Sequence, residues 1–196
     1  MSVKDIQTIT KDNTVDIFTD NIDMYFNLYC EENNIQDMKK ESQAVFTACL
    51  YYIYNHVFKD NKSILKDSNS NYGSYDIDTI DKLCDYYIYN LCNHNNKICS
   101  IYGFSTLTGI NINTILQWAG HRDVKASPGR INIYKKLRIQ REESLSGRIA
   151  DGKVNPVGPI AILNHEYAWS TVAESHGITK KALQADELPK LGQIDE

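Results

Sequence analysis

The chain has 196 residues, with 21 Lys and Arg against 25 Asp and Glu, and a formal net charge of −4. A hydrophobic fraction of 42% can bury a core, which excludes a chain that is disordered throughout. No apolar run is long enough for a transmembrane helix, and the first residues lack the apolar stretch of a secretion signal. Five cysteines without regular spacing indicate reduced thiols, so we expect a cytoplasmic protein without a membrane partner.

The charges are distributed unevenly along the chain. Residues 1–100 sum to −6, residues 101–150 to +5 and residues 151–196 to −3. All five arginines lie between Arg122 and Arg148. Because arginine is well suited to bidentate contacts with phosphate and guanine, a basic segment between acidic flanks indicates a polyanionic partner such as nucleic acid. A solvated helix face with structural ion pairs would give the same pattern.

Residues 1–100 have the periodicity of an acidic helical N-terminal region. Apolar residues recur at spacings of three and four within residues 14–32, 41–58 and 76–91, which predicts three amphipathic helices. The polar stretch at residues 59–74 is typical of a surface loop or an internal linker.

One pattern in this region, Cys-x-Tyr-Tyr-Ile-Tyr-Asn, occurs twice. It spans Cys49–Asn55 and recurs 35 residues later at Cys84–Asn90. Two copies are too few for a solenoid, so we interpret them as two helices that use similar faces in one core.

The segment Ile101–Trp118 has the pattern of a helix-turn-helix. Gly109 falls at the turn, where the backbone needs a positive φ, and Asn111 can cap the second helix. The positions that this motif buries are occupied by Phe104, Thr108, Ile110, Ile115 and Trp118. The same spacing also fits an ordinary α-hairpin, so the pattern predicts the helix-turn-helix geometry and does not by itself predict DNA binding.

The second helix of this motif places polar side chains on its outward face. Asn and Gln can pair bidentately with adenine in the major groove, so we predict a DNA-binding face here. The predicted base contacts come from Asn111, Asn113, Thr114 and Gln117. The predicted phosphate contacts come from Arg122, Lys125, Lys135, Lys136 and Arg138.

The rest of residues 101–150 predicts a basic helix after a polar loop. Residues 120–130 form the loop, with Pro128 and Gly129 as a turn signal, and the helix spans Ile131–Ala150. We expect Arg138 to pair with Glu142 one turn later. The apolar face of this helix carries Tyr134, Leu137, Arg141, Leu145 and Arg148, and the two arginines on it are predicted to be ion-paired structural groups or interface residues.

Residues 151–183 predict a C-terminal helical segment. Asp151 and Gly152 end the preceding helix. Asn155 and Pro156 then begin another helix, as N-cap and first residue, which runs to about Trp169. Residues 184–196 are predicted to be a disordered tail. The predicted fold is all-α: a multi-helix domain containing a helix-turn-helix, a further helical segment and the tail.

The sequence lacks the residues of several common catalytic and metal sites. No glycine-rich phosphate loop leads into Gly-Lys-Ser/Thr. Gly120-His121 followed by Tyr134 resembles the end of a tyrosine recombinase site, but residues 1–121 contain no arginine to complete it. We expect no enzyme, no catalytic residue, no metal and no cofactor. The nearest approach to a metal site is a set of three residues that we interpret as structural: Cys92, His94 and Cys99.

From about residue 40 to residue 191 the sequence resembles small helix-turn-helix proteins of clostridial phages and mobile elements. The matching segments are Phe104–Ile110, Thr114–Trp118, Tyr134–Ser146, Asn155–Trp169 and Glu187–Leu191. The stretch Asn155–Trp169 also resembles small terminase subunits of tailed phages, which recognise packaging DNA, form rings and activate a separate ATPase. The resemblance implies an auxiliary role in phage or element DNA metabolism, in the cytoplasm of a bacterial host.

Two functions follow as expectations. The first is a non-enzymatic DNA-binding protein, either terminase-like or a regulator, that binds double-stranded DNA as a homo-oligomer. Its interface would be the apolar face of Ile131–Ala150 or of Pro156–Trp169. The second is a phage-encoded antagonist, similar to an anti-CRISPR inhibitor, whose acidic helices occupy the basic channel of a host nucleic-acid enzyme. The salt dependence of DNA affinity separates the two, because phosphate contacts release counterions.

Overall fold

The computed structural model describes residues 3–59, 64, 75–120, 126–152 and 154–169, and the side chains from Phe18 onward. Within these residues it contains no strand, so the all-α prediction is confirmed. The predicted tail at 184–196 and most of the predicted loop at 59–74 lie outside the described residues. The α-helices are α1 (Val3–Glu32), α2 (Gln43–Ile53), α3 (Ile77–Tyr86), α4 (Ile101–Thr108), α5 (Ile112–Gln117), α6 (Pro128–Ala150) and α7 (Val157–Tyr167).

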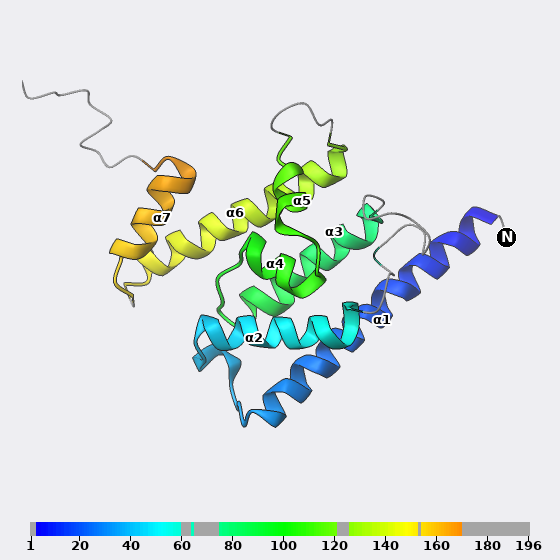
Figure 1. Ribbon diagram of the computed structural model, residues 1–196, viewed down its shortest axis with the longest axis horizontal. Helices are drawn as coiled ribbons and strands as arrows, with labels where there is room; N and C mark the ends of the chain where they lie inside the picture. Colours follow the sequence, from blue (N-terminus) through cyan, green and yellow to red (C-terminus); the bar gives the residue numbers. More distant parts are fainter. Residues whose placement is uncertain (1–2, 60–63, 65–74, 121–125, 153, 170–196) are drawn as a thin grey trace, which may run out of the picture.

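The helices are arranged around α4. Helix α1 packs against α2 and α3, α2 packs against α4, and α3 packs against α6. Helix α6 is long and extends away from this group, and α7 packs against its C-terminal part (Figure 1). The N-terminal end of α1 and helix α7 therefore lie at opposite ends of the molecule (Figure 1).

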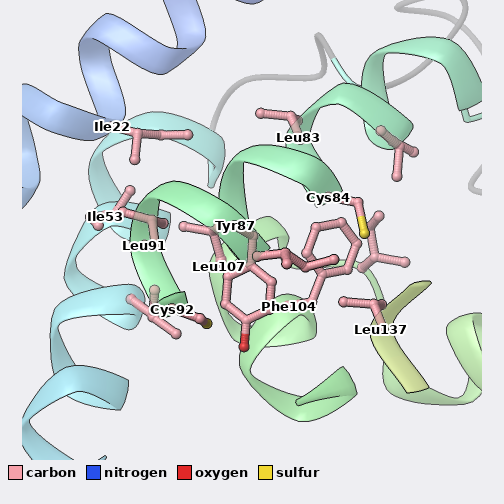
Figure 2. Close-up of a cluster of buried hydrophobic side chains, with 14 of the residues drawn as sticks. Ile22, Ile53, Leu83, Cys84, Tyr87, Leu91, Cys92, Phe104, Leu107 and Leu137 are labelled. Atoms are coloured by element: carbon pink, nitrogen blue, oxygen red, sulfur yellow. The ribbon is translucent and has the colours of Figure 1, made fainter. Parts of the chain in front are cut away.

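A single hydrophobic core joins the acidic N-terminal region to the helix-turn-helix. Helices α1, α2, α3, α4 and α6 all contribute fully buried side chains, many of which appear in Figure 2. Burying one such side chain stabilises the fold by about 1.5–3 kcal/mol. The boundary that the charges suggest at residue 100 is thus a change in surface charge, with a shared core on both sides. Representative members of this core are Ile22, Phe46, Leu83, Phe104 and Leu137.

The repeated Cys-x-Tyr-Tyr-Ile-Tyr-Asn pattern forms equivalent helical structure in its two copies. Each α-helix continues into a π-helical segment, η2 (Tyr54–Phe58) after α2 and η4 (Tyr87–Asn93) after α3. The π-type hydrogen bonds are also equivalent, from Lys59 N to Tyr54 O at 2.9 Å and from His94 N to Tyr89 O at 3.1 Å. The cysteine and isoleucine of both copies are buried, as the interpretation of similar faces expects: Cys49, Ile53, Cys84 and Ile88.

The start of α6 differs from the sequence prediction. Pro128 and Gly129 form the first turn of the helix instead of a loop turn, and Ser127 occupies the N-cap position. Proline is tolerated there because the first N–H groups of a helix have no intrahelical partner. A Cβ at Gly129 would lie 2.7 Å from Cγ2 of Ile77, so the glycine lets the start of α6 approach α3 closely.

The two ends of α7 also refine the prediction. The helix begins at Val157, one residue later than expected, with Pro156 at the N-cap position. Asn155 still contributes, because its Oδ1 accepts a hydrogen bond from Val157 N at 3.0 Å. The helix ends at Tyr167, and Ala168 adopts a left-handed conformation with φ of +55°. The predicted end of α6 is confirmed, since Asp151 is its C-cap residue.

Candidate nucleic-acid interface

The helix-turn-helix geometry is present in α4, the turn at Gly109 and α5. Gly109 has φ of +72° and ends α4, and Oδ1 of Asn111 accepts a hydrogen bond from Asn113 N at 2.9 Å. A positive φ costs glycine little, whereas a residue with a Cβ is strained by it. All the positions predicted to be buried are buried: Phe104, Thr108, Ile110, Ile115 and Trp118.

Two side chains of α4 hold the turn. Ser105 Oγ donates a hydrogen bond to Ile110 O at 2.6 Å, and Thr108 Oγ1 donates to Phe104 O at 2.8 Å. Thr108 Oγ1 also accepts from Ile110 N at 3.3 Å. The backbone groups of Ile110 are therefore satisfied at a point where the chain leaves one helix and enters the next.

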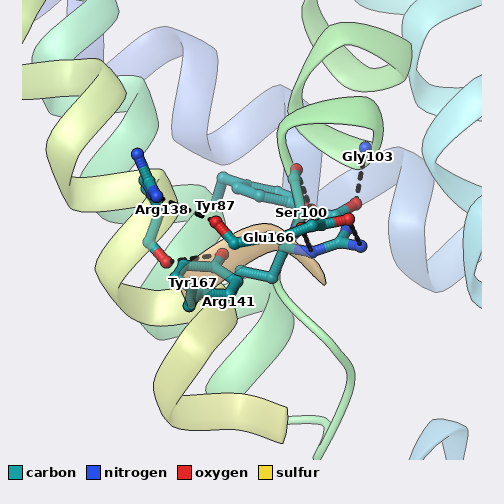
Figure 3. A network of polar contacts seen from close by, with 7 residues as sticks. All are labelled: Tyr87, Ser100, Gly103, Arg138, Arg141, Glu166 and Tyr167. Carbon is teal, nitrogen blue, oxygen red and sulfur yellow. Dashed lines mark hydrogen bonds and ion pairs between the residues drawn. The ribbon is translucent and has the colours of Figure 1, made fainter. Parts of the chain in front are cut away.

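Two tyrosines from the π-helical segments fix α4 in place. The ring of Tyr54, the first residue of η2, covers Gly109, and a Cβ added to that glycine would overlap it. The hydroxyl of Tyr87, the first residue of η4, covers Gly103 in the same way. The Tyr87 hydroxyl also donates to Ser100 O at 3.1 Å and accepts from Ser100 N at 3.2 Å (Figure 3). Sequence reasoning missed both contacts, although both tyrosines lie in the repeated pattern.

The predicted base contacts remain on the surface of α5. Asn113 and Gln117 are exposed, and they lie one turn apart on the same face of the helix. Thr114 is half-buried. Asn111 is exposed, but its side-chain oxygen is occupied as the helix cap. The structure therefore leaves Asn113 and Gln117 as the two amide side chains free to meet an external partner.

Of the predicted phosphate contacts, Lys136 is bound inside the molecule. Its Nζ lies 2.9 Å from Asp81 Oδ1 and 2.7 Å from Asp85 Oδ1, both on α3. Burial acts to lower the pKa of Lys136, but the hydrogen bonds that its ammonium donates to Asp85 and Asp81 outweigh this effect and hold the pKa above its ordinary value. Lys136 thus fixes α6 to α3, which argues against the predicted phosphate contact.

Arg138 is also occupied within the fold. Its Nη2 donates a hydrogen bond to Glu166 O at 2.9 Å, and its guanidinium carbon lies 5.2 Å from the centre of the Tyr167 ring (Figure 3). The Tyr167 hydroxyl donates in return to Arg138 O at 3.0 Å, and burial raises the pKa of Tyr167 to about 12. Glu142, the expected partner of Arg138, instead accepts a hydrogen bond from Trp169 Nε1 at 2.7 Å.

Arg141 and Arg148, predicted to be ion-paired structural groups or interface residues, both bond within the chain, Arg141 to a carboxylate and Arg148 to a backbone carbonyl. Arg141 binds Glu166 of α7 through two nitrogens, with Nε 3.0 Å from Oε2 and Nη2 3.0 Å from Oε1 (Figure 3). Arg148 Nη2 donates to the carbonyl of Asn96 at 3.0 Å. Of these two contacts, the one from Nη2 is a hydrogen bond and the one from Nε is an ion pair only, and together they join α7 to α6.

Few of the predicted cations therefore remain free for a phosphate. Lys135 is exposed on α6 and has no ion pair with the described side chains. Arg122 and Lys125 lie outside the described residues. Of the predicted contacts, the structure leaves Asn113 and Gln117 exposed on α5 and Lys135 exposed on α6.

The apolar faces predicted for self-association differ in exposure. On α6, Leu137 and Leu145 are buried within the chain, so that face is not available to a partner. On α7, Val157 is 69% exposed and Ile160 is 37% exposed. The prediction of an apolar surface for self-association thus stays open for α7.

Neither a metal cluster nor a membrane span is found in the part of the chain that the structure describes. No three His, Cys, Asp or Glu side chains in it come together as a metal ion requires, including those at Cys92, His94 and Cys99. None of its helices combines the length and apolar character needed to cross a bilayer.

Comparison with protein-family models, with curated proteins and with solved structures finds no match to this chain. The geometry of α4, α5 and α6 therefore carries the functional argument.

Proposed function

We propose that this protein is a non-enzymatic DNA-binding protein that reads double-stranded DNA with α5. The observation that carries the proposal is the exposed pair Asn113 and Gln117, held on a helix whose start is fixed by the Asn111 cap and the turn at Gly109. Both amides point from one face of α5, and one major groove can accommodate that face. Lys135 supplies a free cation for the flanking phosphate backbone.

The sequence resemblance supports the biological setting of this proposal. A helix-turn-helix protein of clostridial phages or mobile elements would act in the cytoplasm of the bacterial host, as a regulator or in the manner of a small terminase subunit. In either role it would bind DNA as an auxiliary protein and leave the chemistry to another enzyme.

Binding to duplex DNA from the protein's own operon tests the proposal, measured by fluorescence anisotropy over a salt series and compared with a scrambled duplex. We expect Gln117→Ala to weaken binding to the preferred duplex by roughly 1–3 kcal/mol and to relax the preference at one base pair. The matched control is Gln36→Ala, which removes the same side chain from the exposed loop after α1 and should bind like the parent.

Lys135→Ala tests the phosphate contact. It should weaken binding to every duplex alike and reduce the slope of log affinity against log salt by about one unit. If the parent binds no duplex at low salt, or if Gln117→Ala and Lys135→Ala both bind like the parent, the DNA-binding proposal fails.

A protein-binding antagonist is the second candidate, and the occupied cations favour it. Arg138, Arg141 and Arg148 all bond to other parts of the chain, whereas exposed carboxylates such as Asp20 and Glu31 remain on α1. An acidic helical surface can compete with nucleic acid for a basic channel. Absence of DNA binding by the parent would make this the leading candidate.

A further inference from the structure

The outward face of α5 carries an apolar side chain beside its two amides. Leu116 is 46% exposed, and it follows Asn113 by three residues and precedes Gln117 by one. Residues three and four apart on a helix are neighbours on its surface, so these three side chains form one continuous patch, which we call the α5 face. The other residues of α5 are partly or fully buried: Ile112, Thr114 and Ile115.

The charges around the α5 face suit a polyanionic partner. Residues 86–122 contain no Asp or Glu, although the whole chain has 25 acidic residues. Helices α4 and α5 lie entirely within this segment, so neither carries a carboxylate that would repel phosphate. Glu166 of α7, which borders the same groove as Leu116, is paired with Arg141. A phosphate backbone can therefore approach the α5 face without repulsion from the two helices of the motif.

The side chains of the α5 face match the major-groove edge of A·T base pairs. Adenine presents N7 and its N6 amino group there, an acceptor and a donor that an Asn or Gln amide can pair with bidentately. Thymine is the base that presents an apolar group in the major groove, its C5 methyl. The side chain of Leu116 forms no hydrogen bond, but it can cover that methyl group and remove apolar surface from water. Guanine and cytosine offer Leu116 no such group.

The spacing of the α5 face fits consecutive base pairs. An α-helix rises about 1.5 Å per residue, so Asn113 and Gln117 are about 6 Å apart along the helix axis. Base pairs of B-DNA are about 3.4 Å apart, so this separation corresponds to about two base-pair steps. Leu116 lies between the two amides along the axis. The face therefore spans about three base pairs when α5 lies along the groove.

We propose that the α5 face reads a run of about three A·T base pairs in the major groove. Asn113 and Gln117 pair with adenine, and Leu116 contacts the C5 methyl of a thymine. The inference rests on the proposed function, and it adds which base pairs the protein prefers. It also makes Leu116 a specificity-determining residue.

Three duplexes that differ in their base pairs test this preference with the parent chain, by competition in fluorescence anisotropy at about 50 mM salt. One contains A·T pairs, one G·C pairs and one inosine·cytosine pairs. Inosine presents the major-groove acceptors of guanine but lacks the minor-groove amino group that separates G·C from A·T. We expect the A·T duplex to bind at least about tenfold more tightly than either of the others.

Replacement of thymine by deoxyuridine tests the leucine contact, because it removes the C5 methyl and keeps the hydrogen-bonding groups. For the parent we expect about fourfold weaker binding, the ratio that corresponds to loss of one buried methyl-sized group. Leu116→Ala should bind the thymine and deoxyuridine duplexes alike. The matched control is Leu28→Ala on α1, another exposed leucine, which should keep the parent's ratio. Alanine favours helix, and circular dichroism checks that both variants keep their helices.

The outcomes separate this inference from the function on which it rests. If the parent binds no duplex, DNA binding itself fails, and the base preference fails with it. If the parent binds DNA but does not distinguish A·T from inosine·cytosine, or thymine from deoxyuridine, the preference is overturned while DNA binding stands. If Leu116→Ala keeps the parent's ratio between thymine and deoxyuridine, Leu116 does not contact the methyl group and the proposal is wrong.

Discussion

Helices α5 and α6 were both expected to supply side chains to DNA, but they differ in how exposed those side chains are. The amides of Asn113 and Gln117 on α5 remain exposed. On α6, Lys136 and Arg138 bond to neighbouring helices, and Lys135 remains free among the predicted contacts. A high local density of cations therefore does not by itself create a basic surface, because each cation can find a partner within the fold.

The difference follows from how much of each helix is covered. Helix α5 is short and packs mainly through Ile115, so one face stays open. Helix α6 is long and packs against α3 on one side and α7 on another, so most of its length faces another helix. Asp81 and Asp85 on α3 bind Lys136, and Glu166 on α7 binds Arg141.

Gly109→Val should have the largest effect on this comparison, because it removes the turn that presents α5. Positive φ alone costs a β-branched residue about 1–2 kcal/mol or more, and overlap with the Tyr54 ring adds to that cost. Gly120→Val is the matched control: its φ is +75°, but the nearest atom to an added Cβ is 3.9 Å away. Urea unfolding should show a clearly larger loss for Gly109→Val. Equal losses would mean that Tyr54 does not constrain the turn.

Adjacent lysines on α6 provide the next test. Lys136→Ala leaves Asp81 and Asp85 facing each other without a cation, and we expect a loss of about 1 kcal/mol in the free energy of unfolding, since the pair is partly exposed. Lys135→Ala should change that free energy by less than about 0.5 kcal/mol. For DNA binding the order reverses, with the salt slope reduced by Lys135→Ala and retained by Lys136→Ala. If Lys136→Ala reduces the slope of log affinity against log salt, then Lys136 does contact phosphate.

Glu166→Gln should have the smallest effect on global stability and a clear local one. It removes the ion pair with Arg141, so α7 should separate from α6 more often while the core helices stay closed. Hydrogen–deuterium exchange should then rise in α7 and stay unchanged in α2 and α4. Glu143→Gln is the control, because Glu143 bonds to Gln140 within α6. Unchanged exchange in α7 would show that other contacts hold it.

Much of the fold and part of the candidate site were determined by the sequence alone. The helical periodicity, the buried positions of the helix-turn-helix, the Asn111 cap and the turn at Gly109 all follow from rules that act within one or two helical turns. Exposure of Asn113 and Gln117 follows from the same periodicity. These features could be predicted because the residues that cause them are neighbours in the chain.

Which cations stay free, and which side chains hold α4, depend on contacts between residues that are distant in the sequence. Asp81 and Asp85 lie about fifty residues before Lys136, and Tyr54 and Tyr87 reach glycines in a later helix. Even the start of α6 at Pro128 depends on how closely Gly129 approaches α3. Charge and composition along the chain do not specify these partners, because an ion pair or a ring contact forms wherever packing brings two groups together, at any separation in sequence.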